Sequence, residues 1–201
     1  MFQCLTVNAS GCNVIEIKQQ TGFTLLELII TMAISAILVT TAIPNFQRMI
    51  QDNRMSTNAN ALVSALNFAR SEAVRRGSSV KVCQGTDRNA CFNDATTTDW
   101  AAGWIVVVDA DNDGAFDNSF DELLRVHEPL NSQLTLVKEG GGANLPISYN
   151  ATGIANGNNT LLRLCDTSSD NEVERRIVIS MTGRVSSAKR SSTEAGYQCP
   201  G

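Results

Sequence analysis

The chain has 201 residues, a formal net charge of −4 and 43% hydrophobic residues, which predicts one folded domain or two small ones. A mildly acidic chain has no global attraction to nucleic acid or anionic lipid, although it leaves room for a local basic patch. One histidine beside six cysteines argues against a histidine-rich metal site and favours disulfides or cysteine chemistry.

The first element along the chain is an apolar run from Phe23 to Ile43. Its 21 residues contain a single charged side chain, Glu27. A helix of this length spans roughly 30 Å, so the run predicts a transmembrane helix. Residues 1–22 lack the small-x-small site that follows the apolar run of a conventional signal peptide. Cleavage after Gly22 would instead remove residues 1–22 as a leader and keep the apolar helix on the mature chain.

The second half of the predicted helix, residues 44–77, is amphipathic. Pro44 should kink or loosen the helix near the membrane exit, because proline lacks an N–H and clashes with the preceding turn. Beyond it, apolar residues recur at spacings of three and four, which predicts a stripe that packs on a head. The stripe consists of Ala59, Leu62, Val63, Leu66, Ala69 and Ala73. Gly77, after two arginines, is a suitable C-cap.

Residues 78–201 predict a β-rich globular head. Short runs of β-branched and aliphatic residues alternate with loops rich in Asn, Gly, Ser and Thr. The candidate strands are Ser79–Gln84, Gly103–Asp109, Leu123–Glu128, Leu134–Lys138, Leu161–Cys165 and Arg176–Met181. We therefore expect an α+β fold, with a long N-terminal helix, transmembrane in its first half, packed on a small antiparallel β-rich head.

No catalytic constellation is visible, so the sequence predicts a protein that is not an enzyme. His127 is the only histidine and lies within a candidate strand, where a lone histidine is interpreted as structural. There is no phosphate-binding glycine loop and no nucleophile elbow.

Four cysteines lie in the predicted head. An even number in an exported domain implies disulfides, and four cysteines allow three connectivities. We favour Cys83–Cys91 across a short loop and Cys165–Cys199 holding the C-terminal tail. Zinc is the competing interpretation, but the sequence has no C-x-x-C spacing.

An acidic turn follows the second candidate strand. The run from Asp109 to Gly114 matches the first six positions of a calcium loop, but Phe120 stands at the twelfth position, where a bidentate Glu is expected. Asp121 and Glu122 follow directly. The competing interpretation is a β-turn rich in Asp and Asn. The candidate calcium ligands are Asp109, Asp111, Asp113 and Asp117, and no other cofactor is predicted.

Basic residues gather near the C-terminus, at Arg175, Arg176, Arg184, Lys189 and Arg190. Arg184, Lys189 and Arg190 are candidate phosphate contacts for double-stranded DNA. Neighbouring glutamates reduce the net positive charge of this region, and few aromatic side chains lie nearby for base stacking. A solvated charged face is therefore the competing interpretation.

The run from Thr21 to Glu27 resembles the class III signal of type IV pilins and type II secretion pseudopilins. The resemblance implies that a prepilin peptidase cleaves after Gly22 and methylates the new terminal amine of Phe23. It also implies that Glu27 pairs with that amine, on the same or a neighbouring subunit, as an assembly device. A Glu27 side chain that snorkels to the membrane surface is the alternative.

Later segments resemble the GspH/FimT family of minor pilins, namely Arg70 to Gly77, the strand opened by Trp104, and Thr182 to Arg184. Pro44 falls where pilin helices are locally melted or kinked. DNA-uptake members of the family carry Gly-Arg-x-Arg, and here Gly183 to Ser186 keeps only the first arginine.

The resemblance implies a pilin-like fold and a single-pass protein of the bacterial inner membrane, with a periplasmic head and major and minor pilins as partners. After assembly the protein would lie in the pilus filament or at its tip. Three functions stay open. The first is a minor pilin that helps prime or cap a type IV pilus. The second is a DNA-binding competence pilin, and the third is a pseudopilin of type II secretion.

Overall fold

The computed structural model describes residues 22–86, 91, 100–111, 121–139, 145–156, 159–167, 173–191 and 199. The chain divides into two compact units, residues 1–45 and residues 46–201, and each is described by itself.

A single helix, α1 (Leu25–Arg76), contains 52 residues. It includes Pro44, so the proline does not end the helix, and the local loosening expected there stays a prediction. The helix ends where expected. Gly77 adopts φ of +68° and donates its N–H to the carbonyl of Ala73 at 2.9 Å, as a left-handed C-cap residue does.

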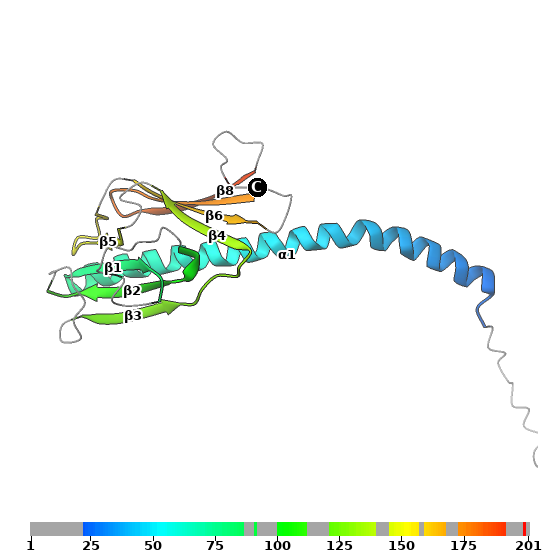
Figure 1. The fold of residues 1–201 in the computed structure, drawn as a ribbon, viewed down its shortest axis with the longest axis horizontal. Coiled ribbons are helices and arrows are strands. Elements are labelled where there is room, and N and C mark those ends of the chain that lie inside the picture. The colour runs from blue at the N-terminus through cyan, green and yellow to red at the C-terminus, as the bar shows by residue number, and fades with distance from the viewer. Residues whose placement is uncertain are drawn as a thin grey trace, which may run out of the picture. The chain divides into compact units, whose positions relative to one another are not determined.

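The head contains two four-stranded antiparallel sheets, which Figure 1 shows beside the C-terminal half of α1. The first sheet has the order β3-β2-β1-β5, and its strands are β1 (Ser79–Gln84), β2 (Trp104–Asp109), β3 (Glu122–His127) and β5 (Ile147–Tyr149). The second sheet has the order β4-β6-β7-β8, and its strands are β4 (Leu134–Glu139), β6 (Thr160–Asp166), β7 (Val173–Ile179) and β8 (Val185–Ser191). A short 3-10 helix, η2 (Trp100–Ala102), precedes β2.

The sequence analysis found six of these strands and missed β5 and β8. Strand β5 has only three residues, too few to show an alternating pattern. Strand β8 is an edge strand rich in serine and basic residues, so it has no apolar signal and was interpreted only as a charged surface. Strand β7 also begins and ends earlier than predicted, which places Met181 in a turn after the strand.

The main core lies between the C-terminal half of α1 and the inner faces of both sheets. Five of the six predicted stripe residues are buried, while Val63 is only half-buried. Met55 and Ala65 join the buried face and widen the stripe beyond the prediction. The sheets contribute alternate residues, among them Val80, Val82, Val106, Leu136, Leu162, Leu164 and Ile177.

Strand β2 is buried along its whole length. Val106 and Val108 face the main core, whereas Ile105 and Val107 pack on the opposite face with Cys83 and Cys91 in a second, smaller cluster. A strand covered on both faces reads as a continuous apolar run, which is why β2 was easy to recognise in the sequence.

Candidate assembly and interaction surfaces

The start of α1 is built by Thr24 and Glu27. The Thr24 hydroxyl oxygen accepts the backbone N–H of Glu27 at 3.2 Å, so Thr24 is the N-cap and Glu27 occupies the third helical position. Thr-x-x-Glu is the sequence signature of a capping box. The sequence analysis overlooked this local role of Glu27, although the spacing shows it. Gly22 and Phe23 precede the cap, and the Phe23 side chain is exposed.

The N-terminal half of α1 is apolar and exposed in the part of the chain that the structure describes. All described residues from Gly22 to Ile50 are exposed. An 18-residue window of α1 has a mean hydropathy of 2.2 with none of it buried, so by length and composition the helix is able to cross a membrane.

Several hydroxyl side chains in this half bond to the backbone of the helix itself. Hydroxyls of Thr31, Ser35 and Thr40 donate to backbone carbonyls three or four residues earlier, at 2.6–2.9 Å. Such local bonds let hydroxyl residues enter a hydrocarbon environment without an unpaired donor. Glu27 is left as the only ionisable side chain between Phe23 and Ile43.

The predicted basic patch is divided in the structure. Arg184 lies at the β7–β8 turn, where its backbone N–H and carbonyl both bond Ser180. Lys189 lies towards the other end of β8, roughly 16 Å along the strand. The Lys189 ammonium is 2.6 Å from Asp52 on α1, and Arg176 is 3.1 Å from Glu174. Arg184 is therefore separated from Lys189, whereas Arg175 lies opposite Lys189 on β7, and Lys189 and Arg176 each lie within ion-pair distance of a carboxylate.

Arg70 on α1 connects two loops of the head. Its guanidinium donates to the carbonyls of Gly153 at 3.0 Å and Thr182 at 3.1 Å. Gly183 has φ of +78°, and a Cβ there would collide with the Gly153 carbonyl oxygen. The Thr182–Arg184 segment that resembles the GspH/FimT family is thus a close-packed turn held on α1, which gives Gly183 a structural reason to be glycine.

The two disulfides are those that the sequence analysis favoured, Cys83–Cys91 and Cys165–Cys199, with Cα atoms 5.1 Å and 5.8 Å apart. Together the two disulfides oxidise all four head cysteines, so the structure argues against the zinc alternative. The second bond brings Cys199 onto β6, although it lies 34 residues after Cys165.

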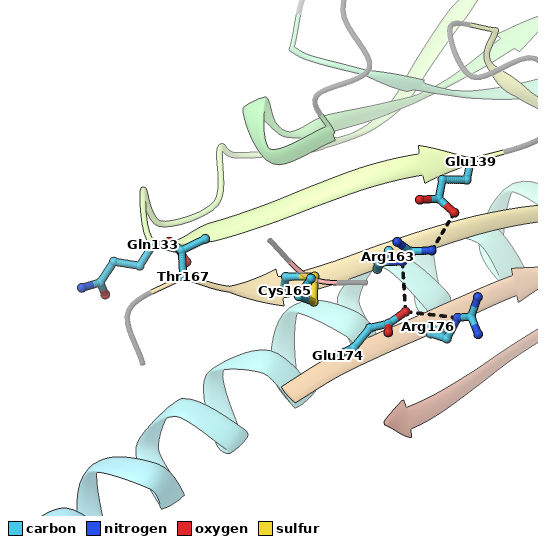
Figure 2. The surroundings of a disulfide bond; sticks show 8 residues. Gln133, Glu139, Arg163, Cys165, Thr167, Glu174 and Arg176 are labelled. Atoms are coloured by element: carbon cyan, nitrogen blue, oxygen red, sulfur yellow. Dashed lines mark hydrogen bonds and ion pairs between the residues drawn. A yellow bond between two sulfur atoms is a disulfide. The ribbon is translucent and has the colours of Figure 1, made fainter. Parts of the chain in front are cut away.

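A buried ion cluster lies beside Cys165 on the same face of the second sheet (Figure 2). Arg163 is 2.7 Å from Glu139 and 3.0 Å from Glu174, and Glu174 is fully buried. The contacts with Glu174 are ion pairs by distance rather than aligned hydrogen bonds. Sequence reasoning gave no sign of this cluster, because the spacing within one strand does not show which residue of the next strand lies opposite.

Two further ionisable groups, one buried and one half-buried, have structural settings. Lys138 on β4 is 2% exposed and donates to the carbonyl of Leu145, and burial lowers its pKa to about 8. His127 on β3 stacks on Trp104 at a centroid distance of 3.8 Å. The stacked, half-buried ring agrees with the structural interpretation of His127.

Three acidic residues converge at the β2–β3 connection. One carboxylate oxygen from each of Asp109, Asp111 and Asp121 lies within 4.8 Å of the others. Asp113 and Asp117, the other two predicted calcium ligands, lie outside the described residues. Asp121 was not among the predicted ligands. It follows the twelfth loop position by one residue, which is the signal that could have included it.

Comparison with known families identifies the chain. The model of the family described as "Type II transport protein GspH" matches residues 58–183, more than half of the 201 residues. The chain belongs to the GspH family. A second match, to the "Prokaryotic N-terminal methylation motif", covers residues 17–43 and includes Gly22, Phe23 and Glu27. The GspH family comprises structural minor pilins and pseudopilins rather than enzymes.

Two solved structures with similar folds are a type IV minor pilin and a minor pseudopilin. The type IV minor pilin FimU of Pseudomonas aeruginosa is 20% identical, with a TM-score of 0.49, over 68% of this chain and 89% of FimU. The minor pseudopilin EpsH of the Type 2 Secretion System of Vibrio cholerae is 14% identical, with a TM-score of 0.46, over 70% of this chain and 99% of EpsH.

Proposed function

We propose that this GspH-family protein is a minor pilin of a type IV pilus machinery that helps prime or cap the filament. Before assembly the N-terminal half of α1 anchors it in the bacterial inner membrane, with the head in the periplasm. The observation that carries the proposal is the exposed apolar half-helix with one carboxylate in its first turn.

An uncovered apolar surface of this size requires a partner. Leu25, Leu28 and Ile37 are each more than half exposed, as are several of their neighbours. Lipid covers such a surface before assembly, and the helices of other pilins cover it in a filament. The same surface thus serves as a membrane anchor and then as an assembly interface.

Glu27 supplies specificity for that interface. A carboxylate within the bilayer costs several kcal/mol unless it is paired. Cleavage after Gly22 by prepilin peptidase creates a positively charged amine on Phe23, four residues before Glu27. Pairing of this amine with Glu27, within a subunit or between neighbours, neutralises both charges and fixes the axial register of adjacent helices.

The pilus branch is preferred to the secretion branch because the Arg70–Gly77 segment resembles the pilus members. DNA capture has less support, because Lys189 is paired with Asp52 and lies far along β8 from Arg184. Both alternatives predict different phenotypes from the same strains.

The test uses two matched substitutions in the full-length protein. Glu27→Gln removes the charge but keeps a residue suited to the third position of a capping box, whereas Thr24→Val removes the cap and keeps the charge. A deletion strain complemented with wild type, with either variant, or with the surface control Glu128→Gln is assayed for sheared pili, twitching and type II secretion. Immunoblots verify equal accumulation, and intact mass of the mature protein verifies cleavage before a methylated Phe23.

We expect Glu27→Gln to reduce surface pili and twitching at least about tenfold, since an unpaired amine remains in the interface, while Thr24→Val has a smaller effect. Intact piliation in Glu27→Gln would contradict the charge-pairing role. Loss of secretion with normal pili in the deletion strain would assign the protein to the secretion branch instead. Normal pili, twitching and secretion combined with lost transformation would favour DNA capture.

A further inference from the structure

The β2–β3 connection brings three carboxylates to one point. Asp109 is the last residue of β2, and Asp121 directly precedes β3. The two strands pair with Val108 opposite Glu122, so Asp109 and Asp121 come together where the strands leave the sheet. Asp111 joins them, and one oxygen from each residue lies within 4.8 Å of the other two.

Asp109 provides a second, independent observation that points to a ligand. Its side chain is 1% exposed, and its Oδ2 lies 2.6 Å from the ammonium of Lys81. Its Oδ1 is buried and accepts no hydrogen bond from any residue that the structure describes. A buried carboxylate oxygen without a partner is costly, and a bound cation would satisfy it.

The Asp121 carboxylate is also held in a fixed position. It is 9% exposed, and its Oδ1 accepts the backbone N–H of Ala110 at 3.0 Å. This bond fixes the Asp121 carboxylate against the end of β2, beside Asp109. Two of the three acidic groups are therefore positioned by the sheet itself.

We propose that Asp109, Asp111 and Asp121 bind a divalent cation, with Ca²⁺ preferred over Mg²⁺. Oxygens on opposite sides of a Ca²⁺ ion lie about 4.8 Å apart, since Ca–O bonds are roughly 2.4 Å, so the three oxygens are close enough to share one ion. Calcium also accepts irregular oxygen geometry, whereas Mg²⁺ demands a near-ideal octahedron with shorter bonds. Asp121 thereby supplies the carboxylate that is missing at Phe120 in the loop pattern.

Affinity should be modest, because Lys81 already places a positive charge beside Asp109. We expect a Kd of about 0.1–1 mM, as in extracellular calcium modules, which suits a head outside the cytoplasm. Binding would link the end of β2 to the start of β3 and so brace edge strand β3, whose first residue, Glu122, also pairs with Arg76. The inference is independent of the pilus, secretion or DNA role.

The test is a calorimetric titration of the full-length chain in detergent, after chelator treatment, with CaCl₂ and separately with MgCl₂. Tryptophan-detected melting is measured in parallel. Asp111→Asn and Asp121→Asn are compared with Glu128→Gln, an exposed carboxylate that also loses one charge. Asparagine at 121 retains an oxygen for the Ala110 N–H, so this variant keeps the local fold.

We expect calcium at about ten times Kd to raise the melting temperature by about 3–6 °C, and magnesium to raise it less. Both aspartate variants should weaken calcium binding more than about tenfold, while Glu128→Gln binds as wild type. No calcium heat and no thermal shift up to about 10 mM would overturn the proposal. So would equal responses to both metals, or aspartate variants that bind calcium as well as the control does.

Discussion

The two halves of α1 share one backbone conformation and differ in what covers them. From Leu25 to Ile50 every residue is exposed, whereas Met55, Leu62 and Leu66 in the second half are at most 1% exposed. The second half has its partner within the chain, in the two sheets of the head. The first half has no covering partner in the part of the chain that the structure describes, and by length and composition it is able to cross a membrane. An apolar helix face thus predicts that the face will be buried. Only the fold shows whether the partner that covers it belongs to the same chain.

The largest expected effect comes from truncating one leucine in each half. Leu66→Ala should lower the free energy of unfolding by about 2–5 kcal/mol, because it leaves a cavity in the main core. Leu38→Ala should change it by less than about 0.5 kcal/mol, because Leu38 is 62% exposed in this chain. Denaturation of the full-length protein in detergent measures both. Tryptophan fluorescence reports the head alone, since Trp100 and Trp104 are both buried there.

Equal destabilisation by the two substitutions would break the comparison, since it would mean that the head also depends on packing of the first half. In a piliation assay the order should reverse. Leu38→Ala then acts on the interface with other subunits, whereas Leu66→Ala reduces piliation only through loss of folded protein.

A pH effect of intermediate size should be confined to the head. Burial lowers the pKa of Lys138 to about 8, below its value of roughly 10.4 in the unfolded chain. Between these values the unfolded state binds more protons than the folded state, so stability rises with pH. We expect the tryptophan-detected melting temperature to increase between about pH 8 and pH 9.5. Lys138→Met should flatten this rise, and an unchanged slope in that variant would exclude Lys138 as its source.

The smallest effect concerns the contact between β8 and the start of the covered half of α1. Lys189 and Asp52 are 44% and 41% exposed, so Lys189→Ala should cost about 0–1 kcal/mol, and less at high salt. The same purified variant, combined with Arg184→Ala and Arg190→Ala, is compared with wild type in gel shifts with duplex DNA. We expect the triple variant to give the same gel-shift pattern as wild type, with no loss of salt-sensitive DNA binding. A shift present in wild type and absent in the variant would instead support DNA capture.

Local patterns made much of the fold predictable. The helical spacing of apolar residues predicted the buried stripe, and Gly77 predicted the end of α1. Both signals depend only on neighbours along the same helix. Six strands were predicted within a few residues, since each carries enough apolar residues for a signal. Strand β8 was missed because an edge strand with serines and basic residues forms only by pairing with β7.

The sequence by itself determined that the chain carries an apolar helix able to span a membrane and a motif that resembles a cleavable leader. It also determined a β-rich head with an even number of cysteines. These features depend on composition and spacing, which the chain carries before it folds. Only the tertiary structure decided that Arg184 is separated from Lys189 along β8 and that Arg163 forms a buried ion pair with Glu174. It also decided that Asp121 lies with Asp109 and Asp111 in one acidic group. Such juxtapositions depend on strand register, and register is fixed by packing between segments that lie far apart in sequence.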